Sequence, residues 1–109
     1  MDEGLYRSSV SRSYYATFSA VVAALGSTGL TPGADREAWT HATLPRLVRQ
    51  HLLREIGHGR VKALRRMLTG AYKDRIIADY VTTESVDRET ASRRLSNATA
   101  VIRLLEKYL

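Results

Sequence analysis

The sequence predicts an all-α fold, an up-and-down bundle of about four helices that forms a single domain over residues 1–109. Two observations carry this prediction. Apolar residues recur at helical spacing in four segments, and the alternation typical of strands never persists beyond a few residues. The length of 109 residues fits one domain with a modest core, so an oligomer interface is a reasonable source of further burial.

The first helix is expected over residues 5–25, because glycines at 26 and 29 and the Pro32-Gly33 pair then give loop signals. Its apolar stripe consists of Val10, Tyr14, Phe18, Val21, Val22 and Leu25. The opposite face carries small residues, namely Ser9, Ser13, Ala16, Ala20 and Ala23. Since small side chains let another backbone approach closely, this helix is expected to contact neighbours on two sides.

The second helix is expected over residues 35–55, with Asp35 as its N-cap. Pro45 interrupts this segment and predicts a kink or a break near Leu44. The third helix is expected over residues 60–80, and its apolar face consists of Val61, Leu64, Leu68, Ala71 and Ala78. Gly70 weakens this helix relative to alanine and indicates a close crossing.

The fourth helix is expected to begin after a cap at Thr82, Thr83 or Ser85 and to continue to the end of the chain. Apolar residues recur along it at alternating spacings of four and three, which is typical of a helix-packing seam. The seam consists of Ala91, Leu95, Ala98, Ile102, Leu105 and Leu109.

Composition narrows the classes of function. The formal net charge of +6 favours polyanions such as RNA, DNA or an acidic protein, although 14 Arg against 3 Lys can also reflect genome composition. The chain has no cysteine, which excludes disulfides, thiolate zinc sites and cysteine nucleophiles. It shows neither a signal-peptide pattern nor an apolar run long enough to span a membrane. We therefore expect a cytoplasmic protein with no membrane partner.

Arg75 lies in the middle of the apolar face of the third expected helix, where an unpaired charge costs free energy. Asp79 lies one turn later, within reach on the same side, and Tyr80 follows it. One interpretation is a structural ion pair that fixes the helix register. The other is an Arg75 that Asp79 holds in a groove to bind phosphate with its planar fork, beside a Tyr80 that stacks on a base or donates its hydroxyl. Spacing alone leaves both open.

The three histidines, His41, His51 and His58, lack the spacing of a helical metal pair, so no metal site is predicted. His58 stands between two glycines and is expected to be a solvated loop residue. The sequence contains no glycine-rich phosphate loop after a strand, and no serine with a recognisable base. It therefore predicts no cofactor.

Three motifs resemble the HEPN domain family. The segment "SVSRSYYATFSAVVAAL" (9–25) is similar to the family's YYA-F helix, and "RIIADY" (75–80) is similar to its R-x-x-ADY motif. Thr40 and His41 stand where one branch of the family has Thr-His. The resemblance covers nearly the full chain, and the order and spacing of the motifs make it fairly specific.

The resemblance implies a helical bundle that commonly dimerises. Many members are metal-independent ribonucleases of toxin–antitoxin and defence systems, and others bind nucleotides or accompany small nucleotidyltransferases. The ribonucleases carry R-x(4–6)-H, but no histidine follows Arg75 at that spacing. The pairs Arg36–His41 and Arg46–His51 fit the spacing and lie in another expected helix. Family members usually have a helix before this one, which we expect to be missing or very short here. We then expect the small face of residues 9–23 to be open to a second protomer or another subunit.

These observations predict an RNA- or nucleotide-binding domain, with metal-independent ribonuclease activity as its catalytic form. Arg75, Asp79 and Tyr80 are the expected catalytic residues, in a groove between two protomers. The alternative is a non-catalytic interaction subunit that binds a nucleotidyltransferase or a larger nucleic-acid-processing complex, in which Arg75 and Asp79 are a structural pair. A basic DNA-binding domain is less favoured, because no helix-turn-helix with a polar recognition helix stands out.

Overall fold

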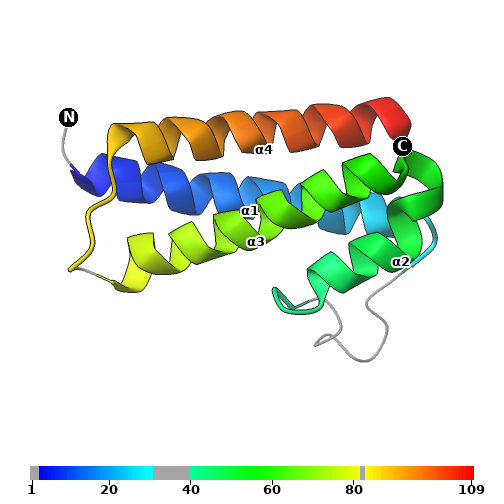
Figure 1. Cartoon of the computed structure of the whole chain (residues 1–109), viewed down its shortest axis with the longest axis horizontal. Coiled ribbons are helices and arrows are strands. Elements are labelled where there is room, and N and C mark those ends of the chain that lie inside the picture. The colour runs from blue at the N-terminus through cyan, green and yellow to red at the C-terminus, as the bar shows by residue number, and fades with distance from the viewer. Residues whose placement is uncertain (1–2, 31–39, 82) are drawn as a thin grey trace.

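A computed structural model describes residues 3–30, 40–81 and 83–109, which form four helices and, within these ranges, no strand. The helices are α1 (Glu3–Ser27), α2 (Leu44–Ile56), α3 (His58–Tyr80) and α4 (Arg88–Tyr108). Helix α1 packs against both α4 and α3, and α2 packs mainly against α3 (Figure 1). The all-α bundle and the two-sided contact of α1 are therefore confirmed.

The core runs through the middle of the bundle, and the predicted stripe of α1 supplies one side of it. Val21 and Leu25 are buried in this core with Phe18 packed against it, and Tyr14 is also buried. Val10 is buried in a second, smaller cluster with Ala78, Val86 and Ala91. The small face divides between two environments. Ser13 is buried, while Ala16 and Ala23 remain exposed.

The predicted break near Leu44 is confirmed, because α2 begins at Leu44 and Pro45 occupies its first turn. Proline suits this position, where a helix has no use for the missing N–H. The expected cap at Asp35 lies outside the described residues. At the other end, Gly57 alone joins α2 to α3, and its φ of 85° is one that glycine adopts without strain.

The predicted apolar face of α3 is confirmed, since all five of its apolar residues are buried. Gly70 lies where α4 crosses. The guanidinium of Arg94 rests over it, so that a Cβ added at position 70 would come within 3.0 Å of an Arg94 nitrogen, and Nε of Arg94 is 2.5 Å from Oδ2 of Asp74. His58 is not in a loop as expected, because α3 begins at this residue.

The expected cap and seam of α4 need correction. Asp87 is the N-cap, and its Oδ1 accepts a hydrogen bond of 2.8 Å from the backbone N–H of Thr90. Leu95 is 57% exposed and Leu109 is also exposed, so the seam does not pass through them. Arg94 instead faces α3, because its side chain covers Gly70 and pairs with Asp74. The buried line of α4 runs through Ala98, Val101 and Leu105.

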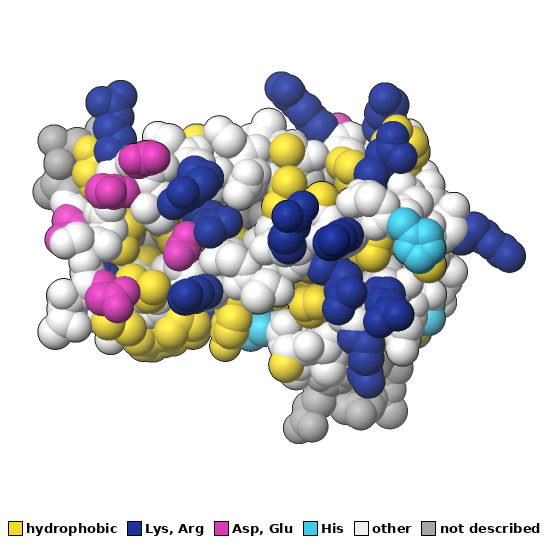
Figure 2. Space-filling view, in the orientation of Figure 1, with side chains coloured by type: hydrophobic (Ala, Val, Ile, Leu, Met, Phe, Trp, Pro, Cys, Tyr) yellow, Lys and Arg dark blue, Asp and Glu magenta, His cyan; other side chains and the backbone are white. Residues whose placement is uncertain are grey.

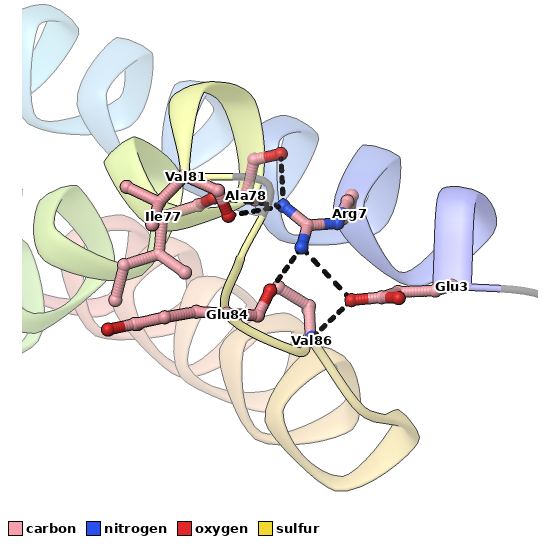
Figure 3. A network of polar contacts seen from close by, with 7 residues as sticks. All are labelled: Glu3, Arg7, Ile77, Ala78, Val81, Glu84 and Val86. Carbon is pink, nitrogen blue, oxygen red and sulfur yellow. Dashed lines mark hydrogen bonds and ion pairs between the residues drawn. The ribbon is translucent and has the colours of Figure 1, made fainter.

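A network around Arg7 ties the start of α1 to the end of α3 (Figure 3). Nη1 of Arg7 donates to three backbone oxygens, those of Ile77, Ala78 and Val81. Nη2 donates to Glu3 and to the backbone oxygen of Glu84, and Oε1 of Glu3 also accepts from the backbone N–H of Val86. A charged side chain thereby adds hydrogen bonds to carbonyl groups at the C-terminal end of a helix, where Ile77 and Val81 also accept from backbone N–H groups.

Within the described ranges, no helix combines the length and the apolar character that a membrane span requires. All four helices instead carry exposed charged residues.

Candidate nucleic-acid interface

Arg75 is held between α1 and its own helix, α3. Its Nη2 donates a hydrogen bond of 2.7 Å to the hydroxyl of Tyr15 on α1. Its Nε lies 3.0 Å from Oδ2 of Asp79, close enough for an ion pair but not aligned for a hydrogen bond. Asp79 also accepts a 3.4 Å hydrogen bond from Ser11. The guanidinium is thus fixed from one side by a hydroxyl and a carboxylate.

Two tyrosine rings flank the same guanidinium. Its central carbon lies 5.3 Å from the centre of the Tyr15 ring and 5.4 Å from that of the Tyr80 ring, which is within cation–π range. Tyr80 is 67% exposed, whereas the Arg75 side chain is only 13% exposed. We call Arg75, Asp79, Tyr15 and Tyr80 the Arg75 site. Its guanidinium is largely shielded from solvent, whereas both tyrosine rings are exposed.

The three residues expected to form the site therefore do lie together, and the ion pair expected from their spacing is present. Burial alone would lower the pKa of Arg75, but Tyr15, Tyr80 and Asp79 together raise it. The guanidinium accordingly keeps its charge. Tyr15 was not among the expected residues. The signal for it was the Tyr14-Tyr15 pair, because neighbouring residues of a helix face different directions, and here Tyr14 is buried while Tyr15 is exposed.

A second group of aromatic residues adjoins the Arg75 site. Buried Tyr14 makes a hydrogen bond through its hydroxyl to Nδ1 of His41, and its ring is 5.3 Å from that of Tyr15. The His41 ring stacks on the Tyr72 ring, with centres 4.8 Å apart and planes at 19°. Tyr72 lies one turn before Arg75 on α3. Through these contacts a histidine that precedes α2 reaches the neighbourhood of Arg75.

The surroundings keep both polar members of this group neutral. Burial, with the positive charge of Arg75 as a second cause, lowers the pKa of His41. Burial is also the main cause that raises the pKa of the Tyr14 hydroxyl. The imidazole is therefore the neutral form near pH 7, which is the form that can accept a proton.

His41, Tyr14 and Tyr72 line a hollow of about 240 Å³. Its remaining lining comes from Ala42, Leu44, Pro45, Leu68 and Thr69. We call it the His41 hollow. No group of three or more metal-ligating side chains gathers here or elsewhere in the part of the chain that the structure describes. A fixed arginine, exposed tyrosines and a neutral histidine can together bind a phosphate, stack on bases and take up a proton.

The model of the HEPN domain family matches residues 1–108. The chain belongs to the HEPN domain family. As a class, HEPN domains bind RNA, act as ribonucleases or accompany nucleotidyltransferases. Neither the curated proteins nor the solved structures contain a match to this chain. What this HEPN domain does must therefore be argued from its own residues.

Proposed function

We propose that this HEPN domain binds single-stranded RNA or a nucleotide at the Arg75 site. The observation that carries the proposal is the guanidinium of Arg75, fixed by Tyr15 and Asp79 and flanked by the ring of exposed Tyr80. An arginine fork matches two phosphate oxygens, and an aromatic ring stacks on any base. The proposal locates the protein in the cytoplasm, where RNA is available.

Each residue has a role in this proposal. Arg75 contacts the phosphate, Asp79 orients Arg75, and Tyr80 stacks on the adjacent base. Tyr15 supports the guanidinium from α1 and offers a second ring. The pairing of two protomers, which would bring two such sites together, belongs to the proposal as well.

Cleavage of the bound RNA is the catalytic form of the same proposal, and the neutral imidazole of His41 favours it. In a metal-independent reaction the 2′-hydroxyl gives its proton to a base, and its oxygen attacks the adjacent phosphorus. The 5′-oxygen then leaves and takes up a proton, which produces a 2′,3′-cyclic phosphate. Arg75 would stabilise the charge on phosphorus, and His41, Asp79 or Tyr80 would serve as the base.

The binding test uses fluorescence anisotropy with a labelled uridine tetranucleotide. We expect Arg75→Ala and Tyr80→Ala each to weaken binding about tenfold or more, because a charged hydrogen bond or a stacked base is lost. Arg103→Ala, which removes an exposed arginine from α4, is the charge-matched control and should bind as the wild type does. Equal weakening by all three would contradict a localised site.

The cleavage test incubates the purified protein with RNA in EDTA, with the wild type beside Arg75→Ala and His41→Ala. Cleavage that both substitutions abolish would support the catalytic form. Cleavage that survives in His41→Ala but not in Arg75→Ala would assign the base to another residue. If the wild type binds the tetranucleotide and cleaves no RNA, the binding function stands without catalysis.

A second candidate function is that of an interaction subunit for a nucleotidyltransferase or another partner protein. The observation that favours it is an open groove of about 350 Å³ between α1 and α4, beside the exposed Leu95. The groove is lined by small, polar and apolar residues, namely Ser9, Arg12, Ser13, Ala16, Leu95, Ala98, Thr99 and Ile102. Sedimentation of Leu95→Glu beside the wild type tests it. Loss of self-association or of a copurifying partner, with tetranucleotide affinity unchanged, would support this function.

A further inference from the structure

The positive charge of the chain is concentrated in one region. Residues 44–69, which cover α2 and the first half of α3, contain seven Lys or Arg and one Asp or Glu. The rest of the sequence holds ten of each kind and is neutral, so this region carries the whole formal net charge of +6. Figure 2 shows these basic side chains gathered over α2 and the beginning of α3, while acidic side chains gather at the opposite end.

These basic residues have no acidic partners among the described residues. The ion pairs found there join Arg7 to Glu3, Arg75 to Asp79 and Arg94 to Asp74, all outside residues 44–69. Most of the seven are exposed. Arg65 is partly buried, and its Nε is shielded from solvent without a hydrogen-bond partner in the described part of the chain. Arg60 donates to the backbone oxygen of Ile56 and lies over the Tyr108 ring. The other exposed basic residues of the region offer donors that form no ion pair with the described residues.

Three adjoining hollows lie between Tyr72, one turn from Arg75 on α3, and this basic region. The His41 hollow shares Pro45 and Thr69 with a second hollow of about 330 Å³, which is lined also by Lys62, Arg65 and Arg66. That hollow shares Lys62 and Arg65 with a third of about 410 Å³. The third hollow is lined by Arg49, Leu53, His58, Gly59, Val61, Lys62 and Arg65. The three hollows thus adjoin one another, from Tyr72 and His41 at one end to the basic residues of α2 and α3 at the other.

The path has the length of a short oligonucleotide. The hollows follow α3 from residue 58 to residue 72, and Arg75 lies one turn further along the helix. These 17 residues of helix rise about 25 Å. Single-stranded binding sites on other folds accommodate roughly 4–16 nucleotides. One end supplies rings that stack on bases, and the other supplies cations that meet phosphates.

We propose that the basic surface of residues 44–69 binds the phosphate backbone of a single-stranded RNA whose other end occupies the Arg75 site. This inference rests on the proposed function and extends it to a longer substrate. A duplex would not fit the aromatic end, because stacking on tyrosine requires unpaired bases. A protein partner is disfavoured, because none of the large exposed hydrophobic residues lies within residues 44–69, and the centre of a protein interface is usually apolar and aromatic.

The test compares two labelled RNAs, a uridine tetranucleotide and a uridine dodecanucleotide, by fluorescence anisotropy at several salt concentrations. The basic-surface variant combines Arg49→Ala, Lys62→Ala and Arg66→Ala, three exposed residues. Its control removes two arginines and one lysine from α4, namely Arg93, Arg103 and Lys107. Both variants lose three positive charges, so their comparison separates a local path from diffuse attraction.

We expect the basic-surface variant to bind the dodecanucleotide about tenfold more weakly or worse. The slope of log affinity against log salt should fall by about two, since each single-strand phosphate contact contributes about 0.7. Its affinity for the tetranucleotide should stay within about twofold, which also shows that the variant is folded and that the Arg75 site is intact. The α4 control should bind both RNAs nearly as the wild type does.

Four results would overturn the inference. Equal weakening by the two triple variants would indicate diffuse electrostatic attraction. Competition by a polyglutamate peptide as strong as that by the dodecanucleotide would assign the surface to an acidic protein. Loss of dodecanucleotide binding in the basic-surface variant but not in Tyr80→Ala would reject the Arg75 site and therefore the continuous path. If Tyr80→Ala weakens both RNAs while the basic-surface variant weakens neither, the Arg75 site stands and the path does not.

Discussion

Arg7 and Arg75 both lie where α1 meets the last turns of α3, but their guanidinium groups are used differently. Arg7 donates to three backbone oxygens through Nη1 and to Glu3 and Glu84 through Nη2 (Figure 3). Among the described residues, the aligned hydrogen bond of Arg75 is the one to Tyr15. An arginine carries five N–H donors. Most N–H donors of Arg7 form hydrogen bonds within the fold. Arg75 is held in place and keeps N–H donors that form no hydrogen bond with the described residues.

This difference separates a scaffold residue from a site residue. The partners of Arg7 are mostly main-chain oxygens at a helix end, which no ligand can replace without unravelling the helix. The partners of Arg75 are the side chains of Tyr15, Asp79 and Tyr80, and both tyrosines are exposed. The two arginines therefore serve as internal controls for each other.

The largest expected effect on stability is that of Arg7→Leu. Removal of the guanidinium breaks its hydrogen bonds to four backbone oxygens and to Glu3, so the free energy of unfolding should fall by about 2–3 kcal/mol. Urea denaturation followed by circular dichroism measures this change. Arg12→Ala, which removes an exposed arginine from the next turn, should stay within about 0.5 kcal/mol of the wild type. If Arg7→Leu leaves the free energy of unfolding unchanged, the Arg7 network is a surface contact that does not stabilise the fold.

Arg75→Gln should have a smaller effect on stability. Asp79 and the exposed side of Tyr15 can be solvated once the arginine is gone, so the free energy of unfolding should fall by about 1 kcal/mol or less. The same denaturation experiment measures it. A loss of about 3–5 kcal/mol would indicate a buried structural pair. In that case Arg75 would belong to the scaffold, as Arg7 does.

The pH dependence of stability gives the smallest and most specific effect. Burial and the charge of Arg75 lower the pKa of His41 in the folded protein, so the unfolded chain binds the proton more readily. The contribution of this neutral histidine is complete above the unfolded pKa of about 6.5 and is lost as the pH falls below that value. Denaturation of the wild type and His41→Phe between pH 5 and 7.5 tests it. Wild-type stability should drop more steeply toward acid, and equal slopes would contradict a buried neutral His41.

Helical faces could be predicted from the sequence, because one helix fixes the relative positions of its own residues. The apolar face of α3, the break at Pro45 and the Arg75–Asp79 pair all follow from spacing along the chain. The predicted seam of α4 was wrong at Leu95 and Leu109, which are exposed, and it took Ile102 where Val101 is buried. The apolar periodicity of α4 included Leu95. It gave no sign that the long side chain of Arg94 would instead cover Gly70 of α3.

Contacts between distant segments could not be predicted. Tyr14 and His41 are 27 residues apart, and Arg7 lies 70 residues from Ile77. No local pattern marks either pair, since one depends on how the segment before α2 meets α1 and the other on how α1 meets the end of α3. The resemblance to the HEPN domain family placed Thr40 and His41 in a motif, but it did not bring them to Tyr14 or Tyr72. Only the fold brings these side chains together.

The central claim is that RNA meets the Arg75 site and not the Arg7 network. The most direct measurement is a titration of ¹⁵N-labelled protein with the uridine tetranucleotide, followed through backbone amide and arginine Nε–Hε signals. We predict shifts at Tyr15, Tyr72, Arg75 and Tyr80, with the Nε–Hε signal of Arg7 unchanged. Shifts confined to the groove between α1 and α4, or no shift at Arg75 under saturating RNA, would contradict the account.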